Sequence, residues 1–94
     1  MPITLHLSAP LRPLAAGQAT LTVEGNTVGA ALTAAVVRFP GLGPALYDHA
    51  GALRSEVRVY LGDSEVHALQ GAATPVREGE VLTVVAPQAA GLGG

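Results

Sequence analysis

Only one stretch of this 94-residue chain has the apolar spacing of a helix, and strand-like alternation lies on both sides of it. Asn26 or Thr27 can cap the first turn of this helix, and Pro40 and Gly41 end it. Its apolar side chains recur at intervals that place them on one helix face. They are Val28, Ala31, Leu32, Ala35, Val36 and Phe39. The sequence therefore predicts a single helix packed on one face of a sheet.

Two alternating runs precede this helix. Ile3, Leu5 and Leu7 alternate with polar residues, and Leu21 and Val23 do the same. Period-two alternation is typical of half-buried strands, so the two runs predict a β-hairpin. The connection of about ten residues contains two prolines and a glycine, and we expect a loop or a wide turn there.

The chain after the helix is harder to interpret. Glycine and proline recur between residues 41 and 56, where Ala45–Tyr47 is compatible with a short helical turn. Val57 to Leu61 alternates again and predicts a strand, and Glu65–His67 is compatible with a second, short one. Gly62 and the two residues after it have the composition of the turn between them.

The last strand is predicted over residues 80–86, which are nearly continuously apolar. Such a run is typical of a central strand covered on both sides. We therefore place it in the centre of the sheet, parallel to the first strand. Pro87 ends it, and the segment Gln88–Gly94 has neither period nor charge, so we expect that segment to be mobile.

Composition excludes several classes of function. Charged residues make up 13% of the chain and the net charge is −2, so a basic surface for nucleic acid or an anionic membrane is not expected. The chain has no cysteine, which excludes disulfides, thiolate metal sites and a cysteine nucleophile. It has no lysine either, and all five cations are arginines. With no apolar run near the roughly 20 residues of a membrane span and no signal-peptide pattern, we expect a cytoplasmic protein.

The remaining candidates for chemistry within the domain are weak. His6, His49 and His67 are scattered without the spacing of a metal site, so no metal is predicted. Glu78 and Glu80 flank a glycine, which is typical of a solvated turn rather than of a catalytic pair. No serine lies in a nucleophile-elbow motif. We therefore expect no catalytic site within the domain.

The chain ends in Gly93-Gly94, and this ending suggests chemistry of its own. A carboxylate becomes an electrophile when ATP adenylates it, but it must first enter the active site of another protein. Glycine has no β-carbon, so two glycines can pass through a narrow channel. A simple frayed end is the alternative, and the fold decides between the two interpretations.

The whole chain resembles the ubiquitin-like β-grasp sulfur carriers of the MoaD/ThiS type. Pro75 to Val81 fits that family's run of proline, apolar, charged, acidic, glycine, acidic and apolar residues. The helix start Thr27-Val28-Gly29, the helix end Phe39-Pro40-Gly41-Leu42 and the terminal Gly-Gly also match. Two departures are Gly91-Leu92, placed before the last two glycines, and Gly62, where the family often has asparagine.

The resemblance implies an α+β, ubiquitin-like β-grasp fold with a mixed sheet of four to five strands, in a domain of residues 1–87 followed by a tail of residues 88–94. It implies a carrier rather than an enzyme, or the small subunit of a synthase such as molybdopterin synthase. Gly94 would be adenylated and converted to a thiocarboxylate, with Gly93 as a steric requirement. No cofactor would be bound, and ATP would be used by the activating partner. Residues expected to dock partners are Tyr60, Leu61, Val85, Ala86, Pro87 and Leu92.

The implied partners are an adenylyltransferase-type activating enzyme, a sulfur donor and an acceptor synthase. The acceptor would be a cysteine synthase-like enzyme or the large subunit of molybdopterin synthase. The loop from Leu11 to Gln18 looks most like the cysteine-synthesis branch. Two alternatives stay open: a ubiquitin-like modifier joined to targets through Gly94, and a non-covalent β-grasp interaction module.

Overall fold

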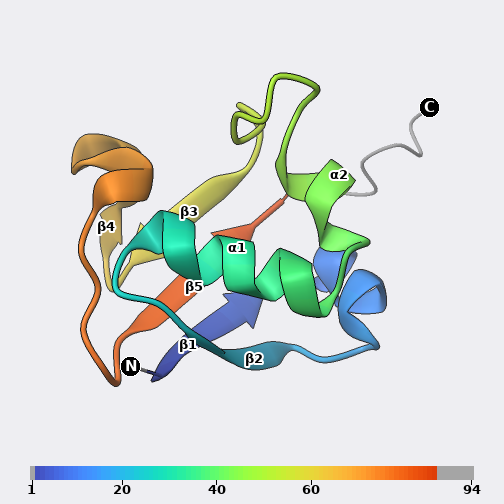
Figure 1. Ribbon diagram of the computed structural model, residues 1–94, viewed down its shortest axis with the longest axis horizontal. Helices are drawn as coiled ribbons and strands as arrows, with labels where there is room; N and C mark the ends of the chain where they lie inside the picture. Colours follow the sequence, from blue (N-terminus) through green and yellow to red (C-terminus); the bar gives the residue numbers. More distant parts are fainter. Residues whose placement is uncertain (1, 87–94) are drawn as a thin grey trace.

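The computed structural model describes residues 2–86, with every side chain among them except that of His67. Five strands form one mixed sheet, and α1 lies across one of its faces (Figure 1). The regular elements are β1 (Pro2–Leu7), β2 (Thr20–Glu24), α1 (Val28–Arg38), α2 (Leu42–Leu46), β3 (Arg58–Leu61), β4 (Ser64–Glu65) and β5 (Val81–Val85). Three short 3-10 helices connect them: η1 (Ala9–Ala15), η2 (Val66–Ala68) and η3 (Gly71–Ala73).

The strand order is β2-β1-β5-β3-β4, which is the β-grasp arrangement. β1 and β2 form the predicted antiparallel hairpin, in register from Pro2↔Glu24 to His6↔Thr20. β5 lies at the centre, parallel to β1 and antiparallel to β3. The first and last strands of the domain are thus neighbours, as the sequence predicted.

The helix stripe forms one half of the core. Thr27 is the N-cap, and its Oγ1 accepts a hydrogen bond of 3.1 Å from the backbone N–H of Ala30. The inward side chains of β1, β2, β3 and β5 supply the other half, with Ile3, Leu5, Val59, Leu82 and Val84 all fully buried. Alternation along each strand therefore sends one set of side chains inward and leaves the other on the opposite face.

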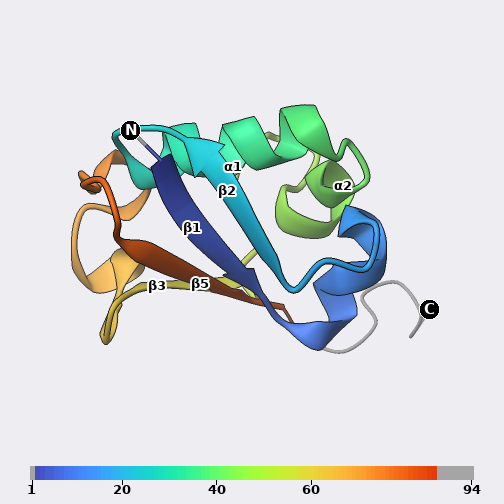
Figure 2. The ribbon, with the colours of Figure 1, turned by 90° about the horizontal axis from the view of Figure 1, so that it is seen from below.

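Both α1 and α2 lie on the same side of the sheet (Figure 2). The expectation that β5 is covered on both sides is wrong, because Val81 and Val85 are 39% and 38% exposed on the outer face. In the described part of the chain, no helix is long and apolar enough to cross a membrane.

Smaller differences occur where the sequence has no clear period. The predicted loop after β1 is the 3-10 helix η1, held by the buried side chains of Leu11 and Ala15. The short helix α2 begins three residues before the expected helical turn at Ala45–Tyr47 and overlaps it at Ala45 and Leu46. The strand expected at Glu65–His67 is β4 at Ser64–Glu65, and the backbone then turns into η2.

Candidate functional site

The end of β5 is held at two points by Ser8, the residue that follows β1. The backbone N–H of Ser8 donates to the carbonyl oxygen of Val84 at 3.0 Å. The Oγ of Ser8 accepts from the backbone N–H of Ala86 at 3.1 Å. Ser8 therefore fixes the chain at the last residue that the structure describes, immediately before the segment that ends in Gly94.

Four predicted site residues, Pro87, Leu92, Gly93 and Gly94, lie outside the described residues. The domain boundary after residue 87 falls there as well. What the structure places is the point at which the chain leaves the sheet. It leaves from the central strand, and both neighbouring strands bond to that strand along its length.

The outer face of the sheet is an open surface beside this exit. Cross-strand partners share a face, so one row runs across all five strands. Its members are Thr20, His6, Thr83, Tyr60 and Glu65. Exposed Val81 and Val85 flank Thr83, and Arg58 pairs with Glu65 at 3.0 Å at one margin. We call this surface the outer face.

The predicted docking residues divide between two sides of the sheet. Tyr60 and Val85 lie on the outer face, since Tyr60 pairs with Thr83 and Val85 follows two residues later. Leu61 packs against the core, and Ala86 is buried at 7% exposure. The difference follows from the period of a strand, which turns adjacent residues to opposite faces.

The segment before β5 is built to start that strand in register. Arg77 N donates to a carboxylate oxygen of Glu80 at 2.6 Å, and the N–H of Glu80 donates back to the carbonyl of Arg77 at 3.0 Å. Gly79 between them has φ +87°, a conformation that favours glycine. The carbonyl of Glu80 then accepts from Thr4, where the pairing with β1 begins. This motif is therefore a turn that positions the last strand, and its acidic residues need no catalytic role.

In the described part of the chain, no group of three or more histidine, aspartate or glutamate side chains is arranged to hold a metal ion. The residue at this exit that sequence reasoning missed is Ser8. Its partner Ala86 lies 78 positions away, and no spacing rule connects the two. The only signal is a serine directly after a strand that lies beside the last strand.

A curated relative matches nearly the whole chain, and a solved structure matches most of it. No family model matches it. The sulfur carrier protein CysO of Mycobacterium tuberculosis is 29% identical over 93 residues, covering 97% of this chain and all of that protein. The crystal structure of that CysO has a TM-score of 0.80, with 28% identity, 87% of this chain and 94% of that chain covered.

This chain is similar, over nearly its whole length, to a ubiquitin-like sulfur carrier of the MoaD/ThiS type.

Two further solved structures have the same fold. The small archaeal modifier protein 1 of H. volcanii has a TM-score of 0.76 and 29% identity, with 92% of this chain and 97% of that chain covered. A chain of the Amycolatopsis orientalis BexX/CysO complex has a TM-score of 0.81. Its identity is 24%, with 87% and 91% of the two chains covered, and at that identity the likeness shows the fold alone.

The departure from the family at Gly62 has a structural reason. Gly62 has φ +62° at the turn between β3 and β4. Glycine and asparagine are the residues that most readily adopt this left-handed conformation. The turn therefore accepts either residue, and the substitution leaves the sulfur carrier fold unchanged.

Proposed function

We propose that this protein carries sulfur as a thiocarboxylate on the carboxyl group of Gly94. The observation that carries the proposal is the full-length match to a protein named as a sulfur carrier, together with a final strand that delivers the tail from the centre of the sheet. The protein then acts as a carrier and co-substrate. The reacting atoms are its own carboxyl group.

The chemistry balances in three steps. The Gly94 carboxylate attacks the α-phosphate of ATP, which gives an acyl adenylate and pyrophosphate. Sulfide supplied by the donor attacks the acyl carbon and displaces AMP, which leaves the thiocarboxylate. The thiocarboxylate sulfur displaces a leaving group from the acceptor's substrate, which gives a thioester. Water then attacks the acyl carbon, the acyl carbon–sulfur bond breaks, the sulfur stays on the product and the carboxylate is restored. Gly93 allows the terminus to enter the narrow active sites that these steps require.

Docking of the folded body must offset the ordering of the tail. Eight residues follow Ala86, and fixing each backbone costs about 1–2 kcal/mol. The outer face supplies a surface for this, since exposed Val81 and Val85 lie on the strand that leads to the tail. We assign Tyr60 and Val85 to this docking face, and Pro87 and Leu92 to the path into the partner.

The partners in this proposal are an ATP-dependent activating enzyme, a sulfur donor and an acceptor synthase. The CysO relative favours an acceptor that makes cysteine, and a molybdopterin synthase large subunit is the second choice. A cytoplasmic location stays a prediction.

The test is the intact mass of the protein isolated from its own cells under conditions that preserve thiocarboxylates. We expect a fraction heavier by one oxygen-to-sulfur exchange, and none in a variant lacking Gly93 and Gly94. Deletion of Ala89 and Ala90 is the matched control, because it shortens the tail equally and keeps the ending. If purified activating enzyme, ATP and sulfide also leave the carboxylate unchanged, sulfur transfer is the wrong assignment.

A ubiquitin-like modifier is the second candidate, and the small archaeal modifier protein with 29% identity favours it. In that case an amine of a target protein displaces AMP from the adenylate and an amide bond forms. The chain has no lysine, so it cannot extend chains of itself through lysine side chains. Slower-migrating conjugates that disappear on deletion of Gly93 and Gly94 would establish this activity.

A further inference from the structure

A small hairpin between α2 and β3 frames a hollow of about 400 Å³. The Oδ1 atom of Asp48 closes the hairpin by accepting from the backbone N–H groups of Ala50 and Ala52, at 2.9 and 3.0 Å. Gly51 turns the chain with φ +83°. The hollow is lined by Gly43, Pro44, Tyr47, Asp48, His49 and Arg54. These contacts give the hairpin a defined shape that does not depend on the sheet.

Arg54 gives the hollow a fixed positive charge. Its Nε donates to the carbonyl oxygen of Pro44 at 2.9 Å, which holds the guanidinium against the end of α2. Its Nη groups have no partner among residues 2–86. Asp48 carries the opposing charge in the lining, and its Oδ1 faces the hairpin backbone, where it accepts two N–H groups. Burial raises the pKa of the Tyr47 hydroxyl and keeps that group neutral. His49 adds further N–H donor capacity, so the lining suits a small carboxylate.

The hollow lies at the end of the sheet from which the last strand leaves. β3 and β5 are antiparallel, and Arg58 at the start of β3 pairs with Val85 at the end of β5. Arg54 precedes Arg58 by four residues, a span of at most about 13 Å. The eight residues after Ala86 can extend about 26 Å. The chain beyond Ala86 is therefore long enough to bring its last residue to Arg54, on the side of the molecule where β5 ends (Figure 1).

We propose that this hollow binds the terminal carboxylate of the same chain, with the Arg54 guanidinium donating N–H groups to the Gly94 carboxylate. The proposal rests on the proposed function, in which Gly94 has a free carboxyl group. A thiocarboxylate has the same charge and nearly the same shape, so the hollow receives it as well. Exposed arginine–carboxylate pairs are weak, so an activating enzyme or acceptor displaces the tail readily.

This contact gives the carrier a resting state. While the thiocarboxylate is held at the hairpin, its sulfur is less accessible to oxidants than it is on a free tail. A partner docked on the outer face lies beside the end of β5. It then binds the tail in place of Arg54. Removing Arg54 therefore leaves the chemistry possible and removes only the protection.

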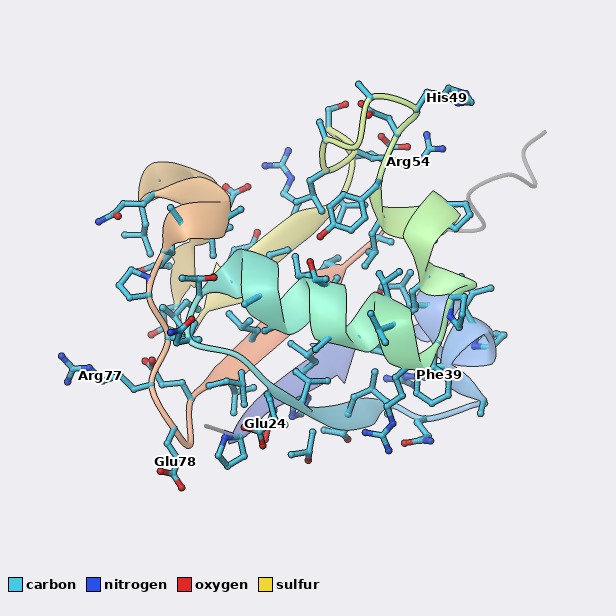
Figure 3. The ribbon with its side chains drawn as sticks, viewed as in Figure 1. Glu24, Phe39, His49, Arg54, Arg77 and Glu78 are labelled. Carbon is cyan, nitrogen blue, oxygen red and sulfur yellow. The ribbon has the colours of Figure 1, made fainter. Side chains whose placement is uncertain are left out.

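The experiment uses the absence of cysteine from the chain. An Ala50→Cys variant of the isotope-labelled full chain takes one nitroxide label at the hairpin tip. We expect the amide signals of Gly93 and Gly94 to lose most of their intensity. Adding Arg54→Gln restores that intensity, while Arg54→Lys retains much of the loss because it keeps the charge. Arg77→Gln is the matched control, since Arg77 lies at the far end of the molecule (Figure 3), and it leaves the loss unchanged.

Salt supplies a second measurement that does not depend on the variants. Near 1 M salt the Debye length is about 3 Å, so the intensity of the Gly94 signal recovers if the contact is ionic. Equal intensities with and without Arg54→Gln overturn the proposal. So does a response of the hairpin signals only to added activating enzyme, which assigns the hollow to the partner. These spectra need no enzyme or sulfur, so their outcome is separate from whether the thiocarboxylate forms.

Discussion

At the scale of single residues, Ser8 joins the end of β1 to the end of the last strand. Replacing Ser8 by alanine removes the acceptor for the Ala86 N–H, and we expect the free energy of unfolding to fall by about 1 kcal/mol. Ser8→Thr keeps a hydroxyl and retains more of the stability. Urea unfolding measures both variants. An unchanged midpoint for Ser8→Ala would show that Ala86 gains nothing from this hydrogen bond.

Gly25 is required by close backbone packing between β2 and α1. A β-carbon there would lie 2.8 Å from the backbone N of Ala31 and 3.1 Å from the carbonyl carbon of Ala30. Because neither atom can move without shifting the helix, Gly25→Ala should cost about 1–3 kcal/mol of stability. Gly43→Ala, within α2, is the control, since the added β-carbon would make an ordinary 3.5 Å contact with Val36 of α1. Thermal unfolding of both variants decides, and equal melting temperatures would contradict the steric argument.

At the scale of the elements, segments with a strong apolar period were predicted correctly, and segments without one were not. The stripe beginning at Val28 and the alternation in β1 and β2 predicted both the elements and their buried faces. The 3-10 helix η1 was missed because Pro10 and Pro13 read as loop residues, while the burial of Leu11 depends on tertiary contacts. Period-two geometry also explains why Leu61 and Ala86 lie on the core side, beside outward-facing Tyr60 and Val85.

The outer face of β5 gives a test that separates docking from stability. Val85→Ser removes apolar surface next to the tail, and we expect KM for the activating enzyme to rise about tenfold, as for loss of a central interface contact. Val37→Ser is the matched control, because Val37 is 76% exposed on α1, on the other side of the sheet. Adenylation kinetics measure both variants. Similar KM values for the two variants would place the docking surface elsewhere.

At the scale of the whole molecule, the parallel pairing of β1 with β5 explains how a small carrier combines a closed core with a reactive end. The strand that completes the sheet is also the strand that delivers the tail, so a native body and a correctly placed exit form together. Chemistry at the C-terminus stays a prediction that the sequence alone can make from Gly93 and Gly94, because carboxyl activation needs only an accessible end. The Ser8 contact and the Arg54 hollow were not predictable, because each joins segments that only the fold brings together.

This topology predicts that the chain folds without the residues after Pro87 but not without β5. A variant ending at Pro87 should lose less than about 1 kcal/mol, because it keeps the whole core cluster of the described residues, from Ile3 to Ala86, and a tail contact at Arg54 would be an exposed ion pair. A variant ending at Glu80 should be unfolded, since it lacks the strand that bonds to both β1 and β3 and loses the fully buried Leu82 and Val84. Circular dichroism with urea unfolding measures both. A cooperative transition in the shorter chain would mean that the hairpin and α1 form a stable unit before β5 closes the sheet.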